Sequence, residues 1–165
     1  MEIETEDHLI AATNVWFGIA NFLILPLPKG WRFGREIHPS EVNSKTQRGD
    51  SSWVTSGRAS HVVFNDDKRV GLELIVSISK GKGGEFKPKL GQMRDQGLIR
   101  LGGHEAHYAL GEVEWGFFRK RVVQSLRLSF YCDQTNRTIA IALTGTCPMD
   151  DLVQILEAMS LLMCH

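Results

Sequence analysis

Two histidines and a glutamate stand close together in the stretch GGHEAHYALGEVEW, residues 102–115. Side chains of these types can ligate a metal ion or transfer protons. The spacing of His104 and His107 differs from the HExxH pattern, which places two histidines on one face of a helix. On a regular strand, residues three apart point to opposite faces, so these two histidines cannot share a metal ion.

Glu105 and His107 do share a strand face, and together they could supply two ligands of a metal-binding or hydrolytic site. A third ligand would come from another segment, with His38 and His61 as candidates. The alternative is a polar strand face without a metal ion. We favour this alternative because the spacing matches none of the usual zinc patterns. The sequence therefore predicts no metal site and no cofactor.

Two further segments could take part in catalysis. Cys147 precedes Pro148 at the expected start of a helix, where the pKa of a thiol can be lowered. A buried, unreactive thiol is the more common alternative. The loop KGKGG, residues 80–84, lacks the Ser or Thr that a phosphate-binding P-loop requires. We therefore expect no catalytic residue, and we expect that the protein is not an enzyme.

A basic run, Arg119–Arg121, lies in a stretch rich in aromatic residues: Trp115, Phe117 and Phe118. Further along the same expected strand, Arg127 and Tyr131 share a face with Arg121. Basic and aromatic side chains on an exposed sheet can bind single-stranded nucleic acid or an acidic partner. The alternative is a solvated strand face. The balance of 19 basic and 19 acidic residues argues against a nucleic-acid binder.

Two tryptophans, Trp31 and Trp53, are flanked by polar residues of expected loops. They are either exposed anchors of a protein interface or caps at the ends of the core. With the strand residues above, they complete the set that we predict for partner binding: Trp31, Trp53, Arg121, Arg127 and Tyr131.

The length of 165 residues suits a single domain, residues 1–165. The cysteines, Cys132, Cys147 and Cys164, are odd in number and widely spaced, which fits neither a disulfide framework nor a zinc knuckle. The acidic N-terminus does not resemble a signal peptide, and the longest apolar run, residues 19–27, is too short to span a bilayer. We therefore predict a cytoplasmic protein without a transmembrane segment.

Alternation of apolar and polar residues predicts most of the strands that must position these side chains. We expect strands at residues 17–25, 60–64, 69–79, 105–115, 120–132 and 138–143, with two hairpins joined by polar turns. Residues 138–143, TIAIAL, are apolar on both faces, which predicts a central strand.

The remaining segments are assigned to helices and loops. Apolar residues at helical spacing predict a helix over residues 149–163, and a weaker pattern predicts one over residues 89–97. Residues 37–57 are expected to form a long polar loop, and residues 80–84 a Gly/Lys loop. Hairpin-linked strands with separated helices predict an α+β domain with an antiparallel sheet.

Three stretches in this order resemble a known superfamily: FLILPLPKGWRF (22–33), GHEAHYAL (103–110), and the hairpin and helix between residues 126 and 162. The order is similar to that of the PsbP/Mog-like superfamily, which includes PsbP, the Ran-binding Mog, and related bacterial lipoproteins and secretion-associated chaperones. The resemblance implies an α/β/α sandwich, an antiparallel sheet flanked by helices. It also implies that Gly103, Glu105 and Ala106 belong to a structural motif at the start of a strand.

In that superfamily most members bind other proteins and are not enzymes. The resemblance therefore implies a non-catalytic protein-binding or adaptor, chaperone-like domain, with another protein as its partner. The alternatives are a metal-binding or hydrolytic protein that uses Glu105 and His107, and a single-stranded nucleic-acid binder that uses Arg119 to Arg127.

Overall fold

The fold is described from a computed structural model, which covers residues 2–14, 18–34 and 56–165. His38, Trp53 and all but the last two residues of the loop expected at residues 37–57 lie outside this part of the chain. The elements are β1 (Thr5–Asn14), β2 (Gly18–Pro28), β3 (Trp31–Phe33), β4 (Gly57–Asn65), β5 (Val70–Lys80), β6 (Gln92–Leu101), β7 (His104–Trp115), β8 (Arg121–Cys132), β9 (Arg137–Gly145), α1 (Met149–Ala158) and a 3-10 helix (Met159–Leu161).

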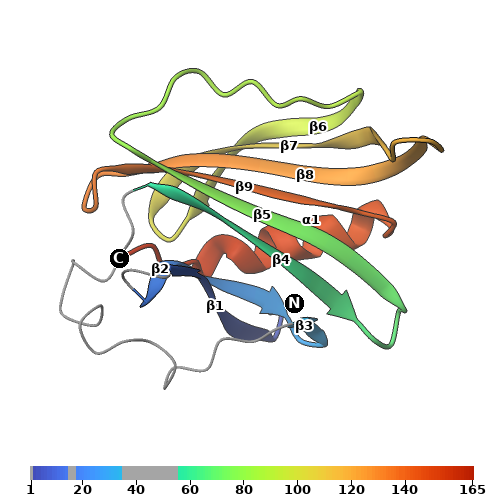
Figure 1. Ribbon diagram of the computed structural model, residues 1–165, viewed down its shortest axis with the longest axis horizontal. Helices are drawn as coiled ribbons and strands as arrows, with labels where there is room; N and C mark the ends of the chain where they lie inside the picture. The colour runs from blue at the N-terminus through green and yellow to red at the C-terminus, as the bar shows by residue number, and fades with distance from the viewer. Residues whose placement is uncertain (1, 15–17, 35–55) are drawn as a thin grey trace.

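Seven of these strands form one antiparallel sheet in the order β3-β4-β5-β9-β8-β7-β6, and β1 pairs with β2 in a separate hairpin (Figure 1). The two expected hairpins are confirmed as β4–β5 and β8–β9. The expected central strand is confirmed as well, because β9 is fourth of the seven strands. β6 forms one edge of the sheet and the short β3 forms the other.

The core lies between one face of the large sheet, which we call the inner face, and the layer formed by α1 and the β1–β2 hairpin (Figure 1). β5 shows why the chain folds this way, since Leu72, Leu74 and Val76 are buried at every second position. Leu152 and Ile155 of α1 are fully buried against them in the same core cluster. No helix in the described ranges is long and apolar enough to cross a membrane.

The opposite, outer face of the sheet is crossed by residues 81–91, which we call the crossing segment. This segment contains most of the Gly/Lys loop. The backbone N–H of Gly83 donates to Thr138 Oγ1 of β9 (2.7 Å), and that hydroxyl donates to the carbonyl of Gly81 (2.7 Å). Phe86 stacks on His107 of β7 with ring centroids 5.7 Å apart. These contacts hold the crossing segment against the sheet.

The expected α+β architecture is wrong. The described residues are mostly strand, with a single α-helix and a short 3-10 helix on one side of the sheet. The antiparallel sheet is therefore not flanked by helices on both faces, and the α/β/α sandwich implied by the resemblance is wrong too. A polypeptide segment without regular structure takes the place of the second helical layer.

The helix expected over residues 89–97 is also wrong, because residues 92–101 form β6. Gly102 and Gly103 join β6 to β7 as a two-residue turn, and both have positive φ, 54° and 85°. Positive φ at both positions is typical of a type I′ hairpin turn. The long pairing of β6 with β7 therefore overrides a weak helical pattern. The last helix, expected over residues 149–163, is confirmed but ends at Ala158 and continues as the 3-10 helix.

Candidate functional site

The most exposed apolar side chains of the described residues lie at the turn between β7 and β8. Phe117 and Phe118 are 91% and 93% exposed, and their rings meet edge to face with centroids 5.1 Å apart. Gly116 starts this turn with φ of 117°, and a Cβ there would lie 2.4 Å from the carbonyl oxygen of Arg119. The turn therefore requires glycine, and its geometry projects two adjacent aromatic rings into solvent.

Two more exposed apolar side chains lie on the strands next to the turn. Trp115, the last residue of β7, is 43% exposed and lies opposite Arg121 of β8 in the strand register. Val122 is 62% exposed and pairs with Glu114, so it lies on the opposite face of the hairpin from Trp115. We call Trp115, Phe117, Phe118 and Val122 the aromatic tip. Isolated exposed apolar residues are ordinary, but two adjacent exposed rings with two more exposed apolar side chains beside the same turn point to an interaction surface.

Basic side chains surround the aromatic tip. Lys120 lies 3.4 Å from Glu114, but both are exposed, so this pair contributes little. Arg119 and Arg121 form no ion pair with any residue that the structure describes. Two unneutralised guanidinium groups beside exposed aromatic rings favour a partner with carboxylates around an apolar surface.

Arg127 and Tyr131 lie on the outer face with Arg121, as the alternation of β8 predicts. They do not belong to the aromatic tip, however. Arg127 is half-buried beneath the crossing segment, and this burial lowers the pKa of its guanidinium, while the charge of Glu73 opposes the shift. The hydroxyl of Tyr131 donates to Asn136 Oδ1 (2.8 Å).

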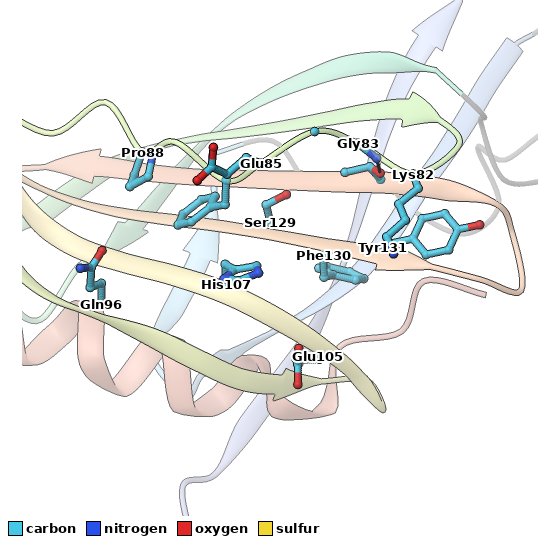
Figure 2. A pocket seen from close by; sticks show the side chains of 13 residues that line it. Lys82, Gly83, Glu85, Pro88, Gln96, Glu105, His107, Ser129, Phe130 and Tyr131 are labelled. Atoms are coloured by element: carbon cyan, nitrogen blue, oxygen red, sulfur yellow. Dashed lines mark hydrogen bonds between the residues drawn. The ribbon is translucent and has the colours of Figure 1, made fainter.

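A cavity of about 640 Å³ separates part of the crossing segment from the outer face (Figure 2). Glu105, His107 and Tyr131 line it from the sheet, and Lys82 and Glu85 line it from the crossing segment. Glu105 and His107 therefore share a face, as predicted. Glu85 lines the same cavity, but among the described residues Glu105, His107 and Glu85 do not bring their ligand atoms together; the group of three or more convergent metal-binding side chains lies elsewhere.

The other candidate ligands are separated from this cavity. His61 lies on β4, where it stacks on Phe33 with centroids 5.0 Å apart. His104 lies on the inner face, stacked on Phe130 at 5.8 Å. The expectation that His104 and His107 point to opposite faces is therefore confirmed, and the arrangement assembles no site from Glu105, His107 and His61.

Two further predicted residues are in the interior. Trp31 is 2% exposed and belongs to the core, so it contributes nothing to a binding surface. Of the two alternatives that the sequence left open, a core residue and not an exposed anchor is the one observed. Cys147 is also buried, and burial raises the pKa of its thiol to about 11. The pKa of Cys147 is therefore not lowered by the helix N-terminus, and the argument that Cys147 is a nucleophile no longer holds.

Known proteins give no independent guide to the function of these surfaces. Comparisons of the chain with protein families, with curated proteins and with solved structures found no match. The resemblance to the PsbP/Mog-like superfamily stays a prediction from the sequence, and the function must be argued from the side chains themselves.

Proposed function

We propose that this chain is a non-catalytic protein-binding domain and that the aromatic tip is its main contact. The observation that carries the proposal is the exposure of Phe117 and Phe118, at 91% and 93%. Burying one such side chain in a partner stabilises a complex by about 1.5–3 kcal/mol. Aromatic residues that fill a pocket dominate the energy of many protein interfaces. The resemblance to superfamily members that bind other proteins supports the same function.

The partner that fits this surface is a protein with an apolar pocket bordered by carboxylates. The two phenylalanines would fill the pocket, while Arg119 and Arg121 would face the carboxylates at the rim. Rim charges of this kind mainly accelerate association and make it sensitive to salt. We place this interaction in the cytoplasm, a proposal supported by three free cysteines, which fit a reducing compartment.

Single-stranded nucleic acid fits less well. Arg127 is half-buried under the crossing segment, so it does not extend the basic group formed by Arg119 and Arg121. The chain also has no net charge, with 19 basic and 19 acidic residues. A nucleic-acid surface needs a continuous basic stripe beside its aromatic platform.

Affinity capture from native extract tests the proposal, with the untagged chain coupled to beads and three variants compared. The variants are Phe117→Ser/Phe118→Ser, Arg119→Gln/Arg121→Gln, and the control Leu161→Ser, which removes an apolar side chain that is 67% exposed in the 3-10 helix. We expect one protein to be retained by the wild type and the control. The dissociation constant for that protein should rise at least 30-fold, about 2 kcal/mol, in the phenylalanine variant. The arginine variant should bind more slowly and lose the salt dependence.

Two results would contradict the proposal. One is a captured protein that binds the phenylalanine variant as tightly as the wild type. The other is that the beads retain no protein, while the wild type binds vesicles of phosphatidylserine and phosphatidylcholine and Phe117→Ser/Phe118→Ser does not. That result would identify the aromatic tip as a membrane contact.

A further inference from the structure

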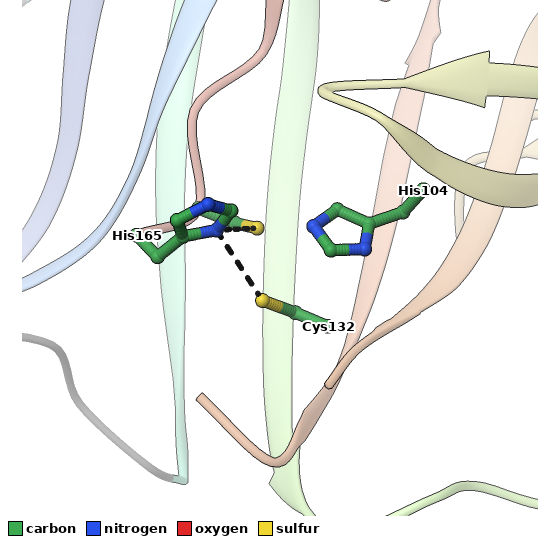
Figure 3. Close-up of side chains that lie close together, drawn as sticks. His104, Cys132 and His165 are labelled. Atoms are coloured by element: carbon green, nitrogen blue, oxygen red, sulfur yellow. Dashed lines mark hydrogen bonds between the residues drawn. The ribbon is translucent and has the colours of Figure 1, made fainter. Parts of the chain in front are cut away.

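Four potential metal ligands converge at the end of the sheet opposite the aromatic tip (Figure 3). They come from three segments: the start of β7, the end of β8, and the chain that follows the 3-10 helix. One ligand atom of each residue lies within 4.8 Å of the others. We call this group the histidine–cysteine cluster: His104, Cys132, Cys164 and His165.

Strand pairing explains why His104 and Cys132 lie side by side. Ala106 of β7 pairs with Phe130 of β8, so a step of two residues along each strand brings His104 opposite Cys132 on the inner face. Cys132 is fully buried, and His104 follows directly after the tight turn at Gly102 and Gly103.

The chain after the 3-10 helix supplies the other two residues. The N–H of Gly102 donates to the carbonyl of Ser160 (3.0 Å), and Met163 exchanges backbone hydrogen bonds with Ile24 of β2 (2.9 and 3.1 Å). The guanidinium of Arg137, itself fully buried, donates to the carbonyl oxygen of Cys164. These contacts position Cys164 and His165 beside Cys132.

The distances match those of a tetrahedral zinc site. With Zn–S bonds of about 2.3 Å and Zn–N bonds of about 2.0–2.1 Å, the sulfur and nitrogen ligands of a tetrahedron are about 3.5–3.6 Å apart. His165 Nδ1 lies 3.6 Å from Cys132 Sγ and 3.3 Å from Cys164 Sγ. One edge of the tetrahedron is thus at the length that the metal requires, and a second is about 0.2–0.3 Å shorter. The remaining edges are at most 4.8 Å long and would contract by up to about 1–1.5 Å when the ion binds.

The fourth ligand has the chemistry of a metal-binding histidine. Nε2 of His104 is buried and has no hydrogen-bond partner, while Nδ1 lies 3.8 Å from Asp133 Oδ1. Figure 3 shows the His104 ring directed toward Cys132 and His165. A carboxylate beside one ring nitrogen and a metal at the other is the usual arrangement around zinc.

The two thiols would bind the ion as thiolates. A divalent metal ion deprotonates coordinating thiols outright. Two thiolates neutralise the charge of Zn²⁺, so the occupied cluster would bury no net charge.

We propose that His104, Cys132, Cys164 and His165 bind one Zn²⁺ ion in a structural site. Two thiolates and two imidazoles are a ligand set that selects zinc, and four protein ligands leave no open position for catalysis. The ion would join the chain after the 3-10 helix to the β6–β7 turn and to the end of β8. This proposal does not depend on the function of the aromatic tip, which lies at the other end of the sheet.

The test measures metal on the full chain, purified without a histidine tag and under a thiol reductant. We expect one equivalent of zinc by elemental analysis. After removal of zinc with a chelator, titration with Co²⁺ should give the visible bands of tetrahedral cobalt and an ultraviolet thiolate-to-cobalt charge-transfer band, saturating at one equivalent. Substoichiometric zinc, together with an octahedral cobalt spectrum, would overturn the proposal whether or not any variant folds.

Variants then assign the ligands. Cys132→Ser and His104→Asn should each weaken Zn²⁺ binding by more than about 100-fold. Loss of a ligand should cost more than the 10–100-fold loss of affinity that is typical when a residue hydrogen-bonded to a ligand is replaced. Asp133→Asn, an exposed change, should weaken it by about 10-fold. Cys147→Ser removes a buried thiol outside the cluster and should leave one equivalent bound. Equal loss of zinc in the Cys147→Ser variant, or a Cys132–Cys164 disulfide that persists under reductant and excludes metal, would contradict the proposal.

Discussion

A matched pair of glycine substitutions tests how the β6–β7 turn holds the chain after the 3-10 helix. Gly102 and Gly103 are neighbours in one turn, and both have positive φ. Alanine at either position therefore carries a similar backbone cost, about 1–2 kcal/mol. The surroundings differ. A Cβ at Gly103 meets nothing within 4 Å, whereas a Cβ at Gly102 would lie 2.1 Å from the carbonyl oxygen of Leu162.

The magnitude follows from what must move. Relief of the contact at Gly102 requires the Cβ–oxygen distance to grow from 2.1 Å to at least 3.4 Å, and the obstacle is backbone, which cannot rotate away. Displacing this well-packed segment costs about 1–3 kcal/mol, and loss of the Gly102–Ser160 hydrogen bond adds about 1 kcal/mol. Gly102→Ala should thus be about 3 kcal/mol less stable than Gly103→Ala.

Urea unfolding of both variants, followed by circular dichroism, measures this difference, with equal m-values confirming that both unfold in the same way. In thermal unfolding, about 3 kcal/mol corresponds to a difference in Tm of roughly 6–12 °C for a chain of this size. Equal stability of the two variants would show that the contact between the β6–β7 turn and Leu162 is not tight, and the reasoning would fail.

Three further predictions concern the pKa values and ion pairs of the described residues. Iodoacetamide should leave Cys147 unmodified in the folded protein at neutral pH, because burial raises the pKa of the thiol to about 11; peptide mapping should find it modified only after unfolding. Lys68→Met should lower the free energy of unfolding by about 2 kcal/mol, because it removes the ion pair of the buried Asp151 carboxylate, with a discount for the partial exposure of Lys68. The exposed control Lys29→Met should leave stability unchanged within error in the same urea assay. The hydrogen bond from Arg32 lowers the pKa of Asp66, so the stability that this interaction contributes is present above the pKa of Asp66 in the unfolded chain and is lost as the pH falls through its pKa in the folded protein. An NMR titration should show a lowered pKa for Asp66, which returns to its ordinary value in Arg32→Met.

The strands that face the core were predictable because their sequences alternate. β5 and β8 each bury every second residue over most of their length, and polar turn residues join each of them to its hairpin partner. The same reasoning fails for β6, which lies at the edge of the sheet and is exposed along most of its length. A strand without a buried face has no alternation to detect. The available signal was the Gly102–Gly103 pair, since two glycines between two strands favour a two-residue hairpin turn.

The candidate sites divide in the same way. The sequence pointed to the neighbourhood of the aromatic tip through the basic run beside Phe117 and Phe118, but the predicted partner-binding set contained none of the four tip residues. Which aromatic residues are exposed could not be predicted, since Trp31, also flanked by polar residues, is buried in the core. Such a distinction depends on which segments cover a side chain, and that is a property of the tertiary structure.

The histidine–cysteine cluster shows where local reasoning ends. His104 attracted attention for its neighbours in the sequence, Glu105 and His107, yet strand geometry directs it away from His107. Its actual neighbours are Cys132, across the β7–β8 pair, and Cys164 with His165, from the segment after the 3-10 helix. The first of these follows from antiparallel pairing once the register is known. The second requires the chain after the 3-10 helix to pack beside the β6–β7 turn, and no alternation or helical spacing of residues in the sequence predicts that contact.

The two proposed sites lie at opposite ends of the same hairpin, and this arrangement separates their roles. β7 and β8 carry the aromatic tip at one end and contribute His104 and Cys132 to the cluster at the other (Figure 1). At the tip, apolar side chains are exposed, which weakens folding and favours association. At the cluster, Nε2 of His104 is buried without a hydrogen-bond partner in the described structure, and the proposed ion would supply one. A metal ion that secures one end of the hairpin would stabilise the framework that presents the other, without contact between the ion and the partner.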